Sequence, residues 1–88
     1  MAELSDDSPE RRVFVVVHRV LAERSVHHTV TADDDLREAG LTSLDMIGLV
    51  LLLEAEFGFL IPETSIMPTN FRSVAAITRL VTTLIGAT

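Results

Sequence analysis

The stretch Ala39-Gly40-Leu41-Thr42-Ser43-Leu44-Asp45 joins a polar, acidic loop to a strongly apolar segment. Gly40 can end one element, and the residues from Met46 to Phe57 are nearly all apolar. A serine or threonine hydroxyl at such a boundary often caps the helix that follows. An exposed hydroxyl at a helix start can also be a site where a group is attached. The role of Ser43 therefore decides how the chain is interpreted.

The apolar segment after this boundary predicts a helix from Ser43 to Phe57, ended by Gly58. One stripe of this helix has i, i+3, i+4 spacing and comprises Leu49, Leu52, Leu53 and Phe57. Much of the remaining face is also apolar, with Met46, Ile47, Val50 and Leu51. A helix that is apolar nearly all round either lies at the centre of the fold or presents a hydrophobic docking face.

Upstream, Ser8-Pro9-Glu10 is a helix start, with Ser8 as the N-cap and Pro9 at the first helical position. The predicted helix runs to about Arg24. Its helical stripe consists of Val13, Val16, Val17, Val20 and Leu21. Because many of these residues are β-branched, propensity alone would also allow a strand. The length of the segment and its Ser-Pro start favour the helix.

The segment from Ser25 to Leu41 has no sustained period, and we expect a long connecting loop with one helical turn from about Asp34 to Ala39. Loops of this length are often functional. The candidate caps are Thr31 and Asp33, the stop is Gly40, and the residues expected to anchor the loop in the core are Leu36 and Leu41.

After the central helix, residues 59–62 form a short extended linker. Pro62-Glu63 can open a short helical turn to about Met67. Ser73 then caps a last helix, which Gly86 ends. The inner stripe of this helix is Val74, Ile77, Leu80, Val81 and Leu84. The predicted fold class is therefore all-α, with three substantial helices and one short one.

The chain has 88 residues, which predicts one small domain. We expect a disordered acidic tail over residues 1–8 and a single domain over residues 9–86. The acidic N-terminus lacks the apolar region of a signal peptide, and the longest apolar run, Leu49–Leu53, is too short to span a bilayer. The absence of cysteine excludes disulfides and is compatible with a reducing cytoplasm, where we expect the protein.

The net charge is −6, and every basic side chain is an arginine. An acidic domain repels phosphate backbones and anionic lipid surfaces, so nucleic acids and membranes are not expected partners. The expected partners are proteins with basic surfaces, since opposite charge speeds encounter.

Catalytic and metal-binding interpretations of the polar residues are weak. Nucleophilic catalysis by Ser43 would need a base such as His27 or His28 and an acid such as Asp45, but the glycines of a nucleophile elbow are missing. The adjacent histidines tend to diverge, so solvated loop histidines are favoured over metal ligands. His18 is expected at the surface or the core boundary. The run Asp33-Asp34-Asp35 lacks the glycine and glutamate of a calcium loop, and a solvated acidic turn is expected.

The order of these elements and several short motifs together resemble acyl carrier proteins, a family that includes peptidyl carrier proteins. The motifs are Asp35-Leu36, Gly40-Leu41-Thr42-Ser43-Leu44-Asp45, Leu53-Glu54-Ala55-Glu56-Phe57-Gly58, Ile61-Pro62-Glu63 and Ser73-Val74-Ala75-Ala76-Ile77. The resemblance covers about Val13 to Leu84.

The resemblance implies a four-helix acyl-carrier-like bundle in which Ser43 bears a 4′-phosphopantetheine arm, derived from coenzyme A, through a phosphodiester bond. The thiol of the arm would hold an acyl or aminoacyl group as a thioester for fatty-acid, polyketide or nonribosomal peptide biosynthesis. Such a chain is not an enzyme. It is a monomeric substrate of a phosphopantetheinyl transferase and of acyl- or aminoacyl-loading and synthase enzymes.

The chain departs from the family pattern at Thr42, where the residue before the serine is usually an aspartate used in meeting the transferase. Gly48 and Ala55 stand where fatty-acid carriers often have glutamates, so the helix is more similar to carriers of secondary metabolism, which dock through hydrophobic contacts. The expected partner-binding residues are Thr42, Leu44, Asp45, Ile47, Leu51 and Glu54.

Each of these assignments has a structural alternative. Ile47 and Leu51 can instead pack in the core, and Asp45 can simply complement the helix dipole. Likewise, Ser43 or Thr42 can be only an N-cap. The alternative function is then a small helical protein-interaction module that uses the apolar central helix, with Ser43 only a helix cap.

Overall fold

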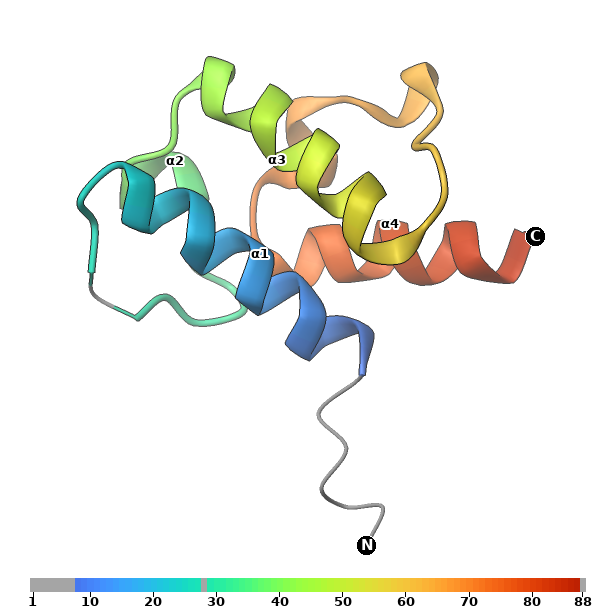
Figure 1. The fold of residues 1–88 in the computed structure, drawn as a ribbon, viewed down its shortest axis with the longest axis horizontal. Coiled ribbons are helices and arrows are strands. Elements are labelled where there is room, and N and C mark those ends of the chain that lie inside the picture. Colours follow the sequence, from blue (N-terminus) through green and yellow to red (C-terminus); the bar gives the residue numbers. More distant parts are fainter. Residues whose placement is uncertain (1–7, 28, 88) are drawn as a thin grey trace, which may run out of the picture.

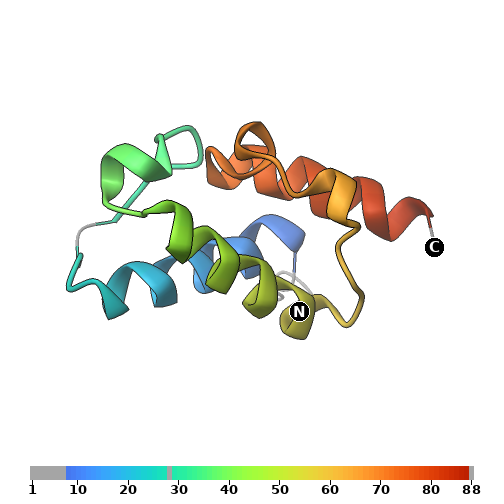
Figure 2. The ribbon, with the colours of Figure 1, turned by 90° about the horizontal axis from the view of Figure 1, so that it is seen from above.

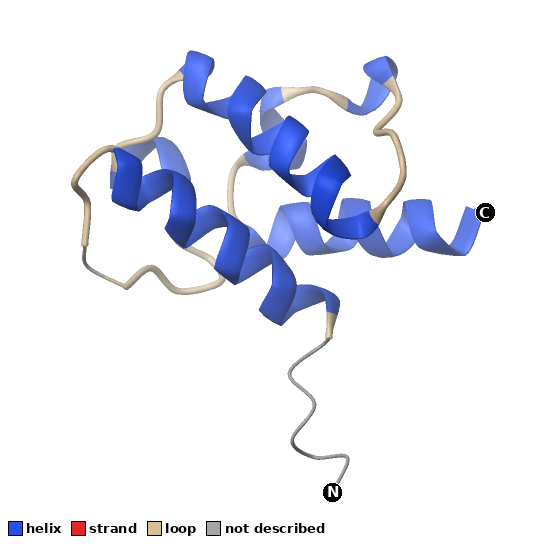
Figure 3. Cartoon of the chain, in the orientation of Figure 1, coloured by secondary structure: helices blue, strands red, loops and turns tan. Residues whose placement is uncertain are grey.

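The protein was analysed as a computed structural model, which describes residues 8–27 and 29–87. These residues form the helices α1 (Pro9–Glu23), α2 (Leu36–Ala39), α3 (Ser43–Phe57) and α4 (Val74–Ala87), and the 3₁₀ turns η2 (Glu63–Ser65) and η3 (Pro68–Phe71). Within the described ranges there is no strand, as Figure 3 shows. The predicted all-α class is confirmed, and α1 is a helix despite its β-branched residues. Of the tail expected over residues 1–8, residues 1–7 lie outside the described residues, and Ser8 is the N-cap of α1.

Helices α1 and α3 run antiparallel, and α4 packs against α1 from behind in the view of Figure 1. Figure 2 shows the same arrangement from above. An arginine ties each end of the antiparallel pair. Near the start of α1, Arg12 Nε donates to Glu56 Oε2 over 2.8 Å. At the other end, Arg24 reaches the start of α3, where Ser43 lies.

The core between the helices is apolar, and the predicted stripes supply most of it. The stripe of α1 is entirely buried, as are Leu49 and Leu53 of α3 and Val74, Ile77 and Val81 of α4. The loop anchors Leu36 and Leu41 are buried as predicted. Val30 and Phe71 are buried too, although neither belongs to a predicted stripe. Burying such side chains stabilises the fold by about 1.5–3 kcal/mol each before the entropy cost of folding is counted.

Local capping residues set the helix boundaries. Ser8 accepts a hydrogen bond from the Arg11 N–H, and Ser73 from the Ala76 N–H, so both predicted caps are confirmed. Gly58 ends α3 with a φ of 77°, a conformation that glycine adopts without strain.

Two local predictions are wrong, and one element was missed. Asp35, and not Thr31 or Asp33, caps the short helix α2, because its carboxylate reaches the N–H groups of Arg37 and Glu38. Gly86 does not end the last helix, since α4 continues to Ala87. The turn η3 was not predicted at all. Among the described residues, no helix is both long enough and apolar enough to cross a membrane.

Candidate functional site

Thr42 is the N-cap of α3, and Ser43 is the first residue inside the helix. The Thr42 hydroxyl oxygen accepts a hydrogen bond from the Asp45 N–H over 3.2 Å. In return, the Asp45 carboxylate accepts one from the Thr42 N–H over 2.9 Å. This reciprocal pair is a capping box, which satisfies N–H groups that a helix start would otherwise leave unpaired.

Ser43 is exposed and its hydroxyl has no hydrogen-bond partner within residues 8–27 and 29–87. Of the two alternatives left by the sequence, the capping role therefore belongs to Thr42. A modification of Ser43 would therefore interrupt no hydrogen bond of this hydroxyl in the described part of the chain. Its position at a helix N-terminus also suits an anion, because the free N–H groups and the dipole of the helix favour negative charge there.

Arg24 joins the end of α1 to this capping box. Its Nε donates to Asp45 Oδ2 over 2.8 Å, and its Nη2 donates to Thr42 Oγ1 over 3.1 Å. The Asp45 side chain is only 16% exposed. The hydrogen bond from the Thr42 backbone N–H and the interactions with Arg24 lower the pKa of Asp45, against the opposing effect of partial burial. Asp45 is therefore a charged group that is already paired.

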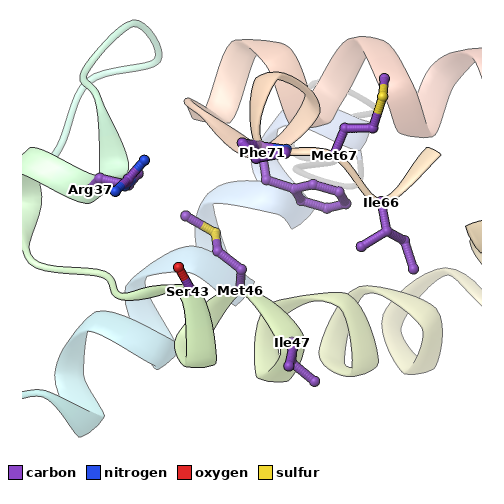
Figure 4. A pocket seen from close by; sticks show the side chains of 8 residues that line it. Arg37, Ser43, Met46, Ile47, Ile66, Met67 and Phe71 are labelled. Carbon is purple, nitrogen blue, oxygen red and sulfur yellow. The ribbon is translucent and has the colours of Figure 1, made fainter. Parts of the chain in front are cut away.

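A small apolar hollow of about 200 Å³ opens beside Ser43, between the start of α3 and the segment that precedes α4. Figure 4 shows the Ser43 hydroxyl at the edge of this hollow, which Arg37 of α2 also lines. The other residues around it are Met46, Ile47, Ile66, Met67, Pro68 and Phe71. The site therefore combines a free hydroxyl, an arginine and an apolar surface.

The residues predicted to bind partners divide into two groups. Leu44, Ile47 and Leu51 are 73%, 58% and 61% exposed, so the alternative that Ile47 and Leu51 pack in the core is wrong. Their spacing of three and four residues places them on one face of α3. Glu54 has an internal role instead, since its carboxylate accepts a hydrogen bond from the Ile61 N–H over 2.8 Å and holds the linker after α3.

His18 and Asp34 make their contacts elsewhere in the fold. His18 is half-buried at the core boundary, where it stacks on Phe14 at 5.8 Å and its Nε2 accepts from the Val30 N–H over 3.4 Å. His27 is exposed, and His28 lies outside the described residues. In the acidic turn, the Asp34 carboxylate accepts from the Thr31 N–H, which makes it part of a local turn.

Two residues of the site were missed by sequence reasoning. Arg24 and Arg37 both come near Ser43 only through the fold. A signal for Arg24 was present, because an antiparallel pairing of the two predicted helices brings the end of the first to the start of the second. No comparable signal marked Arg37.

Comparison with known proteins agrees with this geometry. Residues 12–81 match the family model described as a phosphopantetheine attachment site. Two proteins of Bradyrhizobium diazoefficiens are similar in sequence. The chain is 42% identical to aminoacyl carrier protein 1 over 72 residues, which are 82% of this chain and 80% of that protein. It is 37% identical to aminoacyl carrier protein 2 over 78 residues, which are 89% and 88% of the two chains.

Two crystal structures contain a chain of similar fold. One is a Bradyrhizobium japonicum glycine:carrier protein ligase complexed with glycylated carrier protein, with a TM-score of 0.76 at 38% identity, covering 84% of this chain and 99% of that one. The other is the ligase with its cognate carrier protein and an analogue of glycyl adenylate, with a TM-score of 0.78 at 39% identity, covering 88% and 99%.

The chain therefore belongs to the phosphopantetheine-binding carrier family, and the predicted acyl-carrier-like fold is confirmed. Its prosthetic group is covalently attached phosphopantetheine. The residues at the start of α3 fit this group. A free serine hydroxyl can form the phosphodiester, the helix N-terminus accommodates its charge, and the apolar hollow offers a surface to the arm.

Proposed function

We propose that Ser43 bears the phosphopantetheine arm and that the chain carries an amino acid on it as a thioester. The observation that carries the proposal is the Ser43 hydroxyl, which is exposed at the helix start while Thr42 does the capping. The attachment step joins Ser43 Oγ to the phosphorus of the pantetheine half of coenzyme A. The adenosine bisphosphate half leaves, and the serine proton passes to the transferase. The chain needs no base of its own for this step.

The similar proteins support an aminoacyl cargo. Two of them are named aminoacyl carrier proteins, and a chain of similar fold occurs in crystals with a ligase for glycine. We therefore propose a small amino acid as the cargo, in place of the fatty-acid and polyketide groups that the sequence resemblance also allowed. On this proposal the chain is a substrate of its partner enzymes and has no catalytic activity of its own. Its place of work is the cytoplasm, where ATP-dependent loading enzymes operate.

We further propose that partners dock on one face of α3, called here the docking face, formed by Leu44, Ile47 and Leu51. All three are exposed, apolar and within eight residues of Ser43. Thr42 and Asp45 adjoin this face, but their polar groups already bond to each other and to Arg24. Glu54 is tied to the linker, so its contribution to docking is through the shape of the helix end. The working unit is a monomeric domain over residues 9–86.

Intact-mass spectrometry tests the attachment. The apo-protein is incubated with coenzyme A and a broad-specificity phosphopantetheinyl transferase, and we expect the addition of one phosphopantetheine group. Ser43→Ala should abolish the addition. Ser65→Ala is the matched control, because the Ser65 hydroxyl also lacks a hydrogen bond within the described residues. No addition with several transferases would favour the alternative function, a helical protein-interaction module.

The cargo is tested on the holo-protein with ATP, glycine and a glycine:carrier protein ligase. We expect a second mass increment of one glycyl group, removed by hydroxylamine because a thioester is cleaved under conditions that leave an amide intact. Acylation by a fatty-acid-loading enzyme, with no glycyl addition, would contradict the aminoacyl assignment while leaving Ser43 as the attachment site.

A further inference from the structure

Arg37 is a cation that lies beside Ser43. It lines the apolar hollow and also a second, more open depression, and Ser43 lines both. Its guanidinium makes no hydrogen bond or ion pair with any other residue of the ranges 8–27 and 29–87. Figure 4 shows it on α2, across from the Ser43 hydroxyl. Arg12 and Arg24, in contrast, are both paired with carboxylates.

The backbone that carries Arg37 is firmly held. The Asp35 carboxylate accepts the Arg37 N–H over 2.8 Å, which caps α2. The neighbouring Leu36 is fully buried, and its N–H donates to the Arg72 carbonyl oxygen over 2.8 Å. The base of the Arg37 side chain therefore has a defined place relative to Ser43, although the side chain itself is exposed. This reduces the ordering cost of a contact with a group attached to Ser43.

Arg37 is the one charged residue among the described residues that line the apolar hollow beside Ser43. The Asp45 carboxylate is neutralised by Arg24, and the Asp35 carboxylate is occupied by the cap of α2. Thr42 carries no charge, and Asp35 and Glu38 line the more open depression but not the apolar hollow. A phosphodiester on Ser43 would bring one negative charge into reach of Arg37, and arginine binds phosphate oxygens through two parallel N–H groups.

We propose that Arg37 binds the phosphodiester of the prosthetic group and so fixes the direction in which the arm leaves Ser43. This inference rests on the proposed attachment at Ser43. Because the guanidinium stands at the rim of the apolar hollow, the contact holds the root of the arm beside that hollow and away from the exposed face of α2. Arg37 is then a binding residue for the group and takes no part in forming the thioester.

The test compares apo- and holo-protein by the NMR signals of the arginine Nε–Hε groups, with Arg79 as the control. Arg79 is exposed on α4 and also unpaired within the described residues. Attachment should shift the Arg37 signal and slow its exchange with water, and it should leave the Arg79 signal unchanged. An unshifted Arg37 signal in protein that carries the phosphopantetheine mass overturns the inference and leaves the proposed function intact.

Stability gives an independent readout. The quantity compared is the unfolding constant of the apo-protein divided by that of the holo-protein. In Arg37→Gln this ratio should be roughly 1.4- to 5-fold smaller than in the unsubstituted chain, the range expected for losing an exposed ion pair. Arg37→Lys should restore part of the ratio, and Arg79→Gln should not change it. If the unsubstituted chain gained no phosphopantetheine mass at all, the proposed function would be refuted instead. The inference would also be overturned if R37Q reacted more slowly with the transferase, while the Arg37 signal of the unsubstituted protein did not shift on attachment and the ratio did not change. Arg37 would then be assigned to contact with the enzyme.

Discussion

Thr42 and Ser43 carry adjacent hydroxyls with different roles, and replacing each by alanine should separate stability from modification. The Thr42 hydroxyl accepts the Asp45 N–H at 3.2 Å and an Arg24 N–H at 3.1 Å. Losing an N-cap of this kind costs about 1 kcal/mol, within a range of about 0.5–2 kcal/mol. The Ser43 hydroxyl is exposed and has no bond to lose within the described residues, so Ser43→Ala should change stability by no more than about 0.5 kcal/mol.

Urea unfolding followed by far-ultraviolet circular dichroism measures the difference. The chain has no tryptophan or tyrosine, so the helical signal is a better probe than intrinsic fluorescence. A domain of this size has a denaturant slope near 1 kcal/mol/M. Thr42→Ala should therefore lower the midpoint by roughly 0.5–2 M, and Ser43→Ala should shift it by no more than about 0.5 M.

The same two samples are then assayed for phosphopantetheine by intact mass. Thr42→Ala should still accept the group, because the hydroxyl that receives it remains. Ser43→Ala should accept none despite its unchanged stability. If Ser43→Ala destabilised the protein as much as Thr42→Ala, the cap would have been assigned to the wrong residue. The interaction-module alternative, in which Ser43 is only a cap, would then regain its basis.

Three further predictions concern charge, backbone and docking. Because the folded-state pKa of Asp45 is lowered, the charged side chain stabilises the protein fully above its ordinary pKa of 3.8. The difference in unfolding free energy between the unsubstituted chain and Asp45→Asn should therefore be largest at neutral pH and disappear as the pH falls through the folded-state pKa. Gly58→Ala should cost about 1–2 kcal/mol in urea unfolding because of its φ of 77°, whereas Gly48→Ala, with no atom within 4 Å of the added Cβ, should stabilise α3 by roughly 0.5–1 kcal/mol. Leu51→Ser on the docking face should raise the ligase KM about tenfold with little change in kcat, and Leu60→Ser, 81% exposed beyond the end of α3, should not.

The helix starts could be predicted from sequence because their determinants are local. Ser8 and Ser73 each lie within three residues of the N–H group that they accept, and the apolar period then fixes the buried face. The turn η3 could not be predicted in this way. Its only buried residue, Phe71, is held by tertiary packing, and a single apolar residue after Pro68 has no period to detect.

The same distinction between local and tertiary determinants applies to the site. The position of Ser43 at a helix start follows from neighbouring residues. In contrast, the ion pair between Arg24 and Asp45 spans 21 residues, and the approach of Arg37 to Ser43 depends on how α2 docks against the chain before α4. Gly86 illustrates the opposite error, since glycine permits a helix to end but does not require it.

The structure also changes the meaning of Thr42 in place of the family's usual aspartate. A carboxylate is still present at this point, because Asp45 Oδ2 lies 3.0 Å from the Thr42 hydroxyl oxygen. However, that carboxylate also lies 2.8 Å from Arg24 Nε, so its charge is compensated within the chain. The net charge of −6 favours encounter with basic partners from a distance, while the exposed face of α3 next to Ser43 presents the apolar Leu44 and Ile47. On the proposed docking face, partners would gain more from the exposed Leu44, Ile47 and Leu51 than from an acidic residue beside the serine.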